Sequence, residues 1–186
     1  MNTAPKPATR HFDDINARSS VDYALRTARQ NQMQLNLMAD IKANIMITVS
    51  SLVFSIVIGQ INKPDLLIPL ATLGLFSLGA LFTAIISVLP KFVYPKNEKG
   101  EPDWDSPNFN IMFFGHFSTM DRDEFRARVS HLMATDALVY ESIVEDLYSQ
   151  GVFLGRRKFK FVRYSYICFL TGCALTAIQI PLIFLN

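Results

Sequence analysis

The histidines and cysteines are the residues with which this chain could bind a metal or carry out catalysis, and their spacing supports neither. The three histidines are His11, His116 and His131, and no HExxH, Cys cluster, GxSxG or glycine-rich phosphate loop accompanies them. Cys168 and Cys173 are five residues apart, about 140° around a helix, so they do not suggest a metal pair. The sequence therefore predicts no metal, no cofactor and no enzyme activity.

Aromatic and basic side chains in the long segment 91–163 suggest a different chemistry, the binding of a small anionic nucleotide. Aromatic faces stack on nucleobases, and Arg or Lys binds phosphate charge. The candidate residues are Phe113, Phe114, His116, Arg126, Tyr148 and Lys158. In the alternative, structural interpretation the phenylalanines are core, Arg126 and Arg128 are solvated, and residues 156–160 lie at the membrane surface. Spacing alone favours the structural interpretation.

Three long stretches without a charged residue predict an integral membrane protein. Residues 43–61 are 19 uncharged residues, roughly 28 Å of helix, which matches the hydrocarbon core of a bilayer. Residues 66–89 and 164–185 contain 24 and 22 uncharged residues and satisfy the same criterion. We therefore expect three transmembrane helices, the first two forming a tight antiparallel hairpin around residues 62–65.

The distribution of Lys and Arg predicts the orientation of these spans. Six precede the first span, one lies in the turn 62–65, and eleven lie between Pro90 and Arg163. By the positive-inside rule, the amino terminus and segment 91–163 are cytoplasmic, and the carboxyl terminus lies outside. The net charge of +2 is too small to suggest a nucleic-acid partner.

The remaining segments predict a small cytoplasmic helical bundle, so the fold class is an all-α membrane protein. Residues 1–18 are expected to be a flexible tail, and residues 19–42 a cytoplasmic helix that continues into the first span. Residues 108–117 alternate in a way that suggests a short extended segment. The start signals at Ser118 and Asp121 predict one helix from about Met120 to Gln150, and Gly151 is expected to break or kink it. The bundle would then consist of extensions of spans one and three with one intervening helix.

Each span also carries a stripe of small or hydroxylated residues. The stripes are Asn44, Thr48, Ser51, Ser55 and Gly59 in the first span, Thr72, Gly79, Thr83 and Ser87 in the second, and Cys168, Gly172, Thr176 and Gln179 in the third. Packing between helices within the membrane is the simpler interpretation, and a water-filled path in an oligomer is the alternative. Because no charged residue lies inside the spans, an ion-selective channel is disfavoured.

Three motifs taken together resemble a known family. They are Ala39-Asp40-x-Lys42-Ala43, Asn110-x-x-Phe113-Phe114-Gly115-x-Phe117, and Asp146-Leu147-Tyr148-x-x-Gly151-x-x-Leu154-x-x-Lys158. In order and spacing they resemble the transmembrane effectors of Pycsar anti-phage systems, over residues 26–172. The third motif departs slightly, with Phe159 where a tyrosine is expected.

The resemblance implies a bacterial inner-membrane effector that is paired with a pyrimidine cyclase. On this basis cyclic CMP or cyclic UMP is the expected activating ligand, the bilayer is the target, and infection is aborted by membrane damage. The effector is expected to be a homo-oligomer, because three spans from one chain cannot enclose a wide aqueous path. The alternatives are a membrane anchor or assembly subunit, and a constitutive small channel without a nucleotide ligand.

Asp40 and Lys42 stand where the first helix passes from charged to apolar sequence. Because that helix contains no Pro or Gly between residues 38 and 58, it is expected to transmit motion rigidly from the cytoplasmic bundle to the span. Asp40 and Lys42 are therefore candidate coupling residues at the membrane edge. Asp40→Ala is expected to block membrane damage while nucleotide binding persists.

Overall fold

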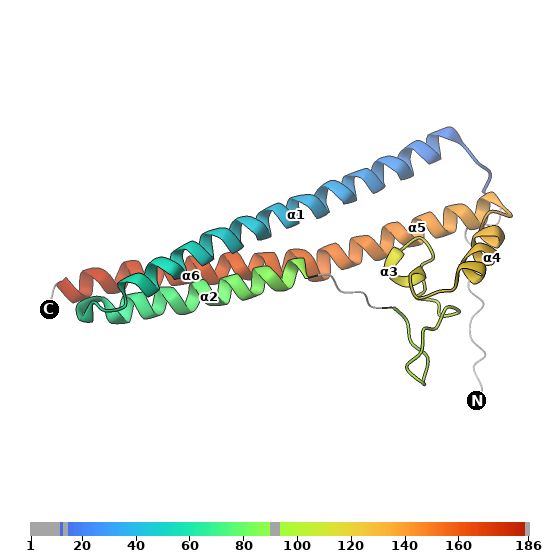
Figure 1. Cartoon of the computed structure of the whole chain (residues 1–186). Coiled ribbons are helices and arrows are strands. Elements are labelled where there is room, and N and C mark those ends of the chain that lie inside the picture. Colours follow the sequence, from blue (N-terminus) through green and yellow to red (C-terminus); the bar gives the residue numbers. More distant parts are fainter. Residues whose placement is uncertain (1–11, 13–14, 90–93, 185–186) are drawn as a thin grey trace, which may run out of the picture. The chain divides into compact units, whose positions relative to one another are not determined.

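The computed structural model describes residues 12, 15–89 and 94–184, which form helices joined by turns and irregular connectors. Most of the predicted tail 1–18 lies outside the described residues. The helical elements are α1 (Ser19–Gln60), η1 (Pro64–Leu66), α2 (Leu67–Val88), α3 (Phe114–Phe117), α4 (Arg122–Leu132), α5 (Asp136–Phe153), η2 (Leu154–Lys158) and α6 (Phe159–Phe184) (Figure 1). Three helical stretches are long and apolar enough to cross a membrane: Ser19–Gln60, Pro64–Val88 and Asp136–Ile183. The prediction of an all-α membrane protein with three spans is confirmed.

The chain divides into two compact units. Unit 1 comprises Met1–Asn31 and Lys91–Gln150, and unit 2 comprises Gln32–Pro90 and Gly151–Asn186. Both α1 and α5 begin in unit 1 and end in unit 2, because each is a single helix across the boundary. Unit 2 therefore contains the apolar stretches, and unit 1 contains most of the charged sequence.

In unit 2, α2 and α6 lie side by side and approach closely through small residues (Figure 1). A Cβ added at Gly172 would lie 2.4 Å from Phe76 Cβ, and one added at Gly79 would lie 3.0 Å from Cys168 Sγ. Ser165 Oγ donates a hydrogen bond across the interface to Ala80 O at 2.8 Å. Small side chains and hydroxyls of this kind allow backbones in a membrane to pack tightly. The packing interpretation is therefore confirmed for Gly79, Cys168 and Gly172, whereas the hydroxyls of the second-span stripe donate to carbonyls of their own helix.

The first span, in α1, packs through a face other than its hydroxylated stripe. Its buried residues are Ala39, Ala43, Met46, Ser50 and Val57, and Met46 packs with Ala80 and Ala84 of α2. The hydroxylated stripe is exposed or half-buried, and Thr48, Ser51 and Ser55 donate to carbonyls of their own helix. Within the described chain this stripe therefore does not form the buried face of α1, and the packing interpretation of the first span stays a prediction.

In unit 1, the helix predicted from about Met120 to Gln150 is divided. The Asp121 carboxylate caps α4 as predicted, accepting from Asp123 N at 3.0 Å, but α4 ends at Leu132. A new helix, α5, starts at Asp136, where Leu138 N donates to Thr135 Oγ1. A hydroxyl that serves as a cap competes with continuous helix, and this explains the break.

Two other local expectations were also wrong. Residues 108–117 are not extended: Met112 N donates to Asn110 Oδ1 at 2.8 Å, which folds a turn, and α3 follows it. Gly151 does not break α5, which continues to Phe153. The irregularity lies instead in η2, a π-helical segment that joins α5 to α6.

The close approach of α2 and α6 makes Gly172 a sensitive position. Gly172→Ala should lower the free energy of unfolding in detergent micelles by about 1–3 kcal/mol, because the new methyl group forces the helices apart. Thermal unfolding followed by circular dichroism measures this effect. Gly59→Ala is the matched control, since nothing lies within 4 Å of its added Cβ. Equal unfolding midpoints for the two variants would contradict the proposed packing.

Candidate functional site

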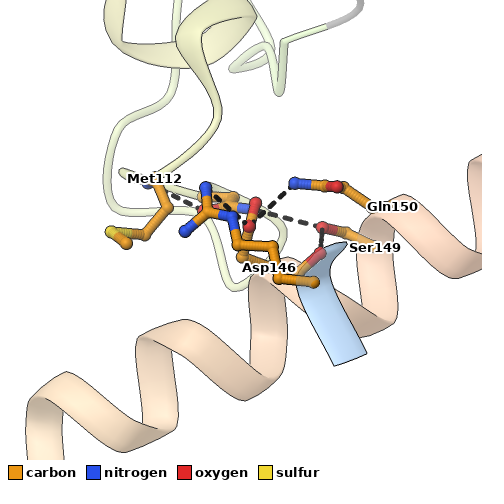
Figure 2. A network of polar contacts seen from close by, with 6 residues as sticks. Met112, Asp146, Ser149 and Gln150 are labelled. Carbon is orange, nitrogen blue, oxygen red and sulfur yellow. Dashed lines mark hydrogen bonds and ion pairs between the residues drawn. The ribbon is translucent and has the colours of Figure 1, made fainter. Parts of the chain in front are cut away.

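A buried carboxylate, Asp146 on α5, lies at the centre of unit 1 and is only 1% exposed. Arg29 of α1 approaches it, with Nη2 at 3.3 Å from Oδ2, and Gln150 Nε2 donates to the same oxygen at 2.8 Å. Asn110 Nδ2 donates to the other oxygen, Oδ1, at 3.0 Å (Figure 2). An ionised carboxylate is stable at this depth only with such partners, so Asp146 holds α1, α5 and the 110–117 loop together.

Asn110, which bonds to Asp146, also fixes the conformation of the 110–117 loop. Its side chain accepts from Met112 N and also donates to Ser149 Oγ at 3.1 Å (Figure 2). Its backbone N–H donates to His116 Nδ1 at 3.0 Å. The imidazole of His116 stacks on Phe109, with ring centroids 5.7 Å apart, and meets the edge of Phe113 at 5.0 Å. A compact aromatic loop thus depends on one buried asparagine.

This loop forms one wall of a hollow of about 330 Å³ in unit 1. Residues of α4 and α5 form the other walls. The lining residues are Phe109, Asn110, Ile111, Arg128, His131, Leu132, Ser142 and Glu145. The volume is at the lower end of the range of about 300–1,000 Å³ that is typical of small-ligand sites. The mixture of an aromatic ring, a cation and several hydrogen-bonding groups suits a small polar ligand.

Arg128 is the fixed positive charge of this hollow. Its guanidinium donates to Asp105 Oδ1 at 2.8 Å, to Glu124 Oε1 at 2.6 Å and to Trp104 O at 2.9 Å. The hydrogen bonds to Asp105 and then Glu124 raise the pKa of Arg128 above its ordinary value, so it stays charged. A guanidinium has five N–H groups; these bonds use three of them, and the two carboxylates offset the charge of Arg128.

The start of α1 is tied to α5 at a second place in unit 1. Tyr140 is buried and donates its hydroxyl to Asp22 Oδ1 at 2.6 Å, while Arg18 N donates to the same hydroxyl. The hydrogen bond to Asp22 raises the pKa of Tyr140 above its ordinary value, so the phenol remains protonated at neutral pH. Together with the Asp146 contact, this bond fixes the first turns of α1 on α5.

The residues predicted from sequence fall into three groups. Phe113 and His116 pack against each other, and Phe114 is next to them but 56% exposed; none of the three lines the hollow. Arg126 and Tyr148 are exposed and do not line the hollow. Lys158 belongs to unit 2, as do Asp40 and Lys42.

Lys158 takes part in a separate polar contact in unit 2. It is 7% exposed, and its Nζ lies 2.6 Å from Asp40 Oδ1 and 2.5 Å from Asn36 Oδ1. This contact joins α1 to η2 next to the apolar spans. Lys42, by contrast, is exposed.

Sequence reasoning did not select Asn110, Asp146, His131, Ser142 or Glu145, and it mentioned Arg128 only beside Arg126. A signal was present for two of them, because Asn110 and Asp146 open two of the three motifs quoted above. The structure shows that these two residues bond to each other. Among the described residues, no three His, Cys, Asp or Glu gather where they could hold a metal ion.

The Asp146 contacts lead to a stability prediction. Asp146→Asn should destabilise unit 1 by about 2 kcal/mol, less than a fully buried pair would, because Arg29 is 38% exposed. In the native protein, three donors share the two carboxylate oxygens of Asp146. The asparagine amide would offer these donors only one acceptor oxygen. Hydrogen exchange in residues 110–117 should become roughly 30-fold faster, since about 1.4 kcal/mol corresponds to a factor of ten. Glu141→Gln, an exposed charge change on the same helix, is the control, and similar exchange rates in both variants would contradict the role of Asp146.

Comparison with known proteins places this architecture in a family. No curated protein and no solved structure matches the chain. A family model does match, over residues 23–185, and its description is the Pycsar effector protein domain. The match covers all three spans and both polar contacts, from Arg29 to Lys158. The chain therefore belongs to the Pycsar effector protein domain family, the transmembrane effectors of an anti-phage defence system.

Proposed function

We propose that this membrane effector binds a cyclic pyrimidine nucleotide, cyclic CMP or cyclic UMP, and then disrupts the bilayer so that infection is aborted. Pycsar systems pair an effector with a cyclase that makes the cyclic nucleotide signal. The observation that carries the proposal is the hollow of about 330 Å³ beside the Asp146 contacts. The effector acts by a change of conformation and not by catalysis.

The lining groups suit the two ends of such a ligand. A cyclic nucleotide carries one negative charge, which Arg128 can bind with its two remaining N–H groups, next to His131. The edge of a pyrimidine offers an amino or imide N–H, and Ser142 and Glu145 supply acceptors for it. A purine is larger and presents a different edge, so the pyrimidine nucleotides should bind best.

The Asp146 contacts provide a route from the hollow to the membrane. Asn110 lines the hollow and bonds to Asp146, which in turn contacts Arg29 on α1. The same helix continues without interruption from Arg29 into its apolar stretch and ends at Gln60. A ligand shifts this system only if it binds the active arrangement more tightly than the resting one. We propose that α1 transmits the shift, with Asp40 as a coupling residue.

The membrane-damaging form is proposed to be a homo-oligomer in a bacterial inner membrane. The hydroxylated face of α1, which includes Thr48 and Ser55, has no described partner helix within the chain and is available to a second copy. In this proposal the amino terminus and segment 91–163 are cytoplasmic and the carboxyl terminus is outside. The sequence-selected residues Phe113, Phe114, His116, Arg126, Tyr148 and Lys158 do not line this hollow, so they are the second choice for nucleotide contact.

Nucleotide binding should depend on the cation of the hollow. In isothermal titration with detergent-purified protein, Arg128→Gln together with His131→Gln should weaken binding of cyclic CMP or cyclic UMP by at least about tenfold, since even one hydrogen bond to a charged group contributes about 1.5–3 kcal/mol. Arg122→Gln, an exposed charge change at the start of α4, should bind like the native protein.

Two results would count against this location of the site. If the Arg128 and His131 variant binds normally, the nucleotide lies elsewhere, and Phe114, Tyr148 and Lys158 become the next positions to substitute. If neither cyclic pyrimidine nucleotide binds the native protein, the anchor subunit and the constitutive channel become the leading functions.

The coupling role of Asp40 makes a separate prediction. Asp40→Ala removes the partner of Lys158, so nucleotide affinity should stay within about twofold while nucleotide-triggered dye release from liposomes is lost. Replacing the pair together, as Asp40→Asn with Lys158→Met, leaves no unpaired buried charge and separates the loss of coupling from a loss of stability. Lost nucleotide binding in Asp40→Ala would overturn the coupling role.

A further inference from the structure

A second hollow, of about 790 Å³ and open to its surroundings, lies in unit 2 where η2 passes into α6, and all of its described lining residues come from this one helical stretch. Its lining residues are Gly155, Arg156, Phe159, Lys160, Arg163, Tyr164 and Ile167. Three of them are cations, two are aromatic, and none is acidic. This composition separates it from the hollow in unit 1, which contains Glu145 and a single guanidinium.

The basic side chains of residues 156–160, in and next to the π-helical segment, lie on two sides of the helix. Lys158 turns inward and pairs with Asp40, whereas Arg156, Lys160 and Arg163 are exposed. Among the described residues, the ion pairs found involve none of these three exposed cations. Lys160 Nζ lies 5.8 Å from the centre of the Tyr164 ring, a cation over an aromatic face. Within the described part of the chain, the hollow therefore has three positive charges that no carboxylate at ion-pair distance neutralises.

The other end of the hollow is apolar. Arg163 is the last charged residue of the chain, and the uncharged stretch that crosses the membrane begins at Tyr164. Ile167, one turn further along α6, also lines the hollow and is exposed. Basic and aromatic residues at the end of a span lie at the depth of lipid headgroups. The hollow thus joins a site for an anion to a surface for a hydrocarbon chain.

We propose that this hollow is a binding site for the headgroup of an anionic phospholipid. The phosphate and any further headgroup charge lie among Arg156, Lys160 and Arg163, and the acyl chains follow Tyr164 and Ile167 along α6. A free phosphate would use only the basic half of the hollow, and a zwitterionic lipid carries no net charge to match it. The proposal is independent of nucleotide binding, because the two hollows share no residue.

The site can be tested by native mass spectrometry of the full chain, released from nanodiscs that contain equal parts of phosphatidylglycerol and phosphatidylcholine. The native protein should retain phosphatidylglycerol in preference to phosphatidylcholine. Substituting Arg156→Gln, Lys160→Gln and Arg163→Gln together should reduce the retained phosphatidylglycerol at least about tenfold, since each basic residue near an anionic surface contributes about fivefold. The matched control is Lys96→Gln, Lys99→Gln and Arg122→Gln, which removes the same charge from exposed positions and should retain the lipid.

Each other outcome overturns the proposal. Equal retention of the two lipids by the native protein would show that there is no anionic site. Equal losses in the two triple variants would show that only net charge matters. Displacement of the lipid by excess inorganic phosphate would assign the hollow to a free anion. Loss of cyclic nucleotide binding in the Arg156, Lys160 and Arg163 variant would assign the hollow to the nucleotide. Should that triple variant fail to fold, the lipid preference of the native protein and of Arg156→Gln alone still decides the question.

Discussion

The ion pair and hydrogen bonds of one buried carboxylate, Asp146, determine how unit 1 is built. A charge at this depth has a large desolvation cost, and three donors from α1, from α5 and from the 110–117 loop compensate for it. The amide oxygen of Asn110 accepts a hydrogen bond from Met112 N and so folds the loop. The wall of the hollow that this loop forms therefore depends on the contact between Asn110 and Asp146. The hollow and helix α1 are therefore linked through two side chains, Asn110 and Asp146, and the proposed response depends on this link.

Unit 2 is built on a different principle. Its helices are apolar on most sides, and the hydrophobic effect contributes little to helix association inside a membrane. Helices α2 and α6 are instead held together by close approach at Gly172 and Gly79 and by hydroxyl hydrogen bonds such as Ser165 to Ala80. Helix α1 makes fewer such contacts, and the Asp40 and Lys158 pair is its main polar attachment in this unit.

The fold was largely predictable, because uncharged stretches of 19 or more residues have one physical solution in a bilayer. The breaks at Thr135 and around Asn110 were not, since they depend on single side chains that bond to nearby backbone. Of the candidate hollow, the sequence predicted only the segment, residues 91–163, in which it lies. Arg126 and Arg128 are indistinguishable in sequence, and only the positions of Asp105 and Trp104, more than 20 residues away, show which one is fixed in the hollow. Asp146 opens one of the three motifs, but its burial depends on partners from distant segments, which spacing does not reveal.

The central claim is that a cyclic pyrimidine nucleotide turns a resting membrane protein into one that damages the bilayer. The most direct test is dye release from liposomes that contain the purified native protein, with cyclic CMP, cyclic UMP or cyclic AMP added separately. Our account predicts no release without nucleotide, release with at least one cyclic pyrimidine nucleotide, and little with cyclic AMP. Release before any nucleotide is added, or none with either pyrimidine nucleotide, would contradict it.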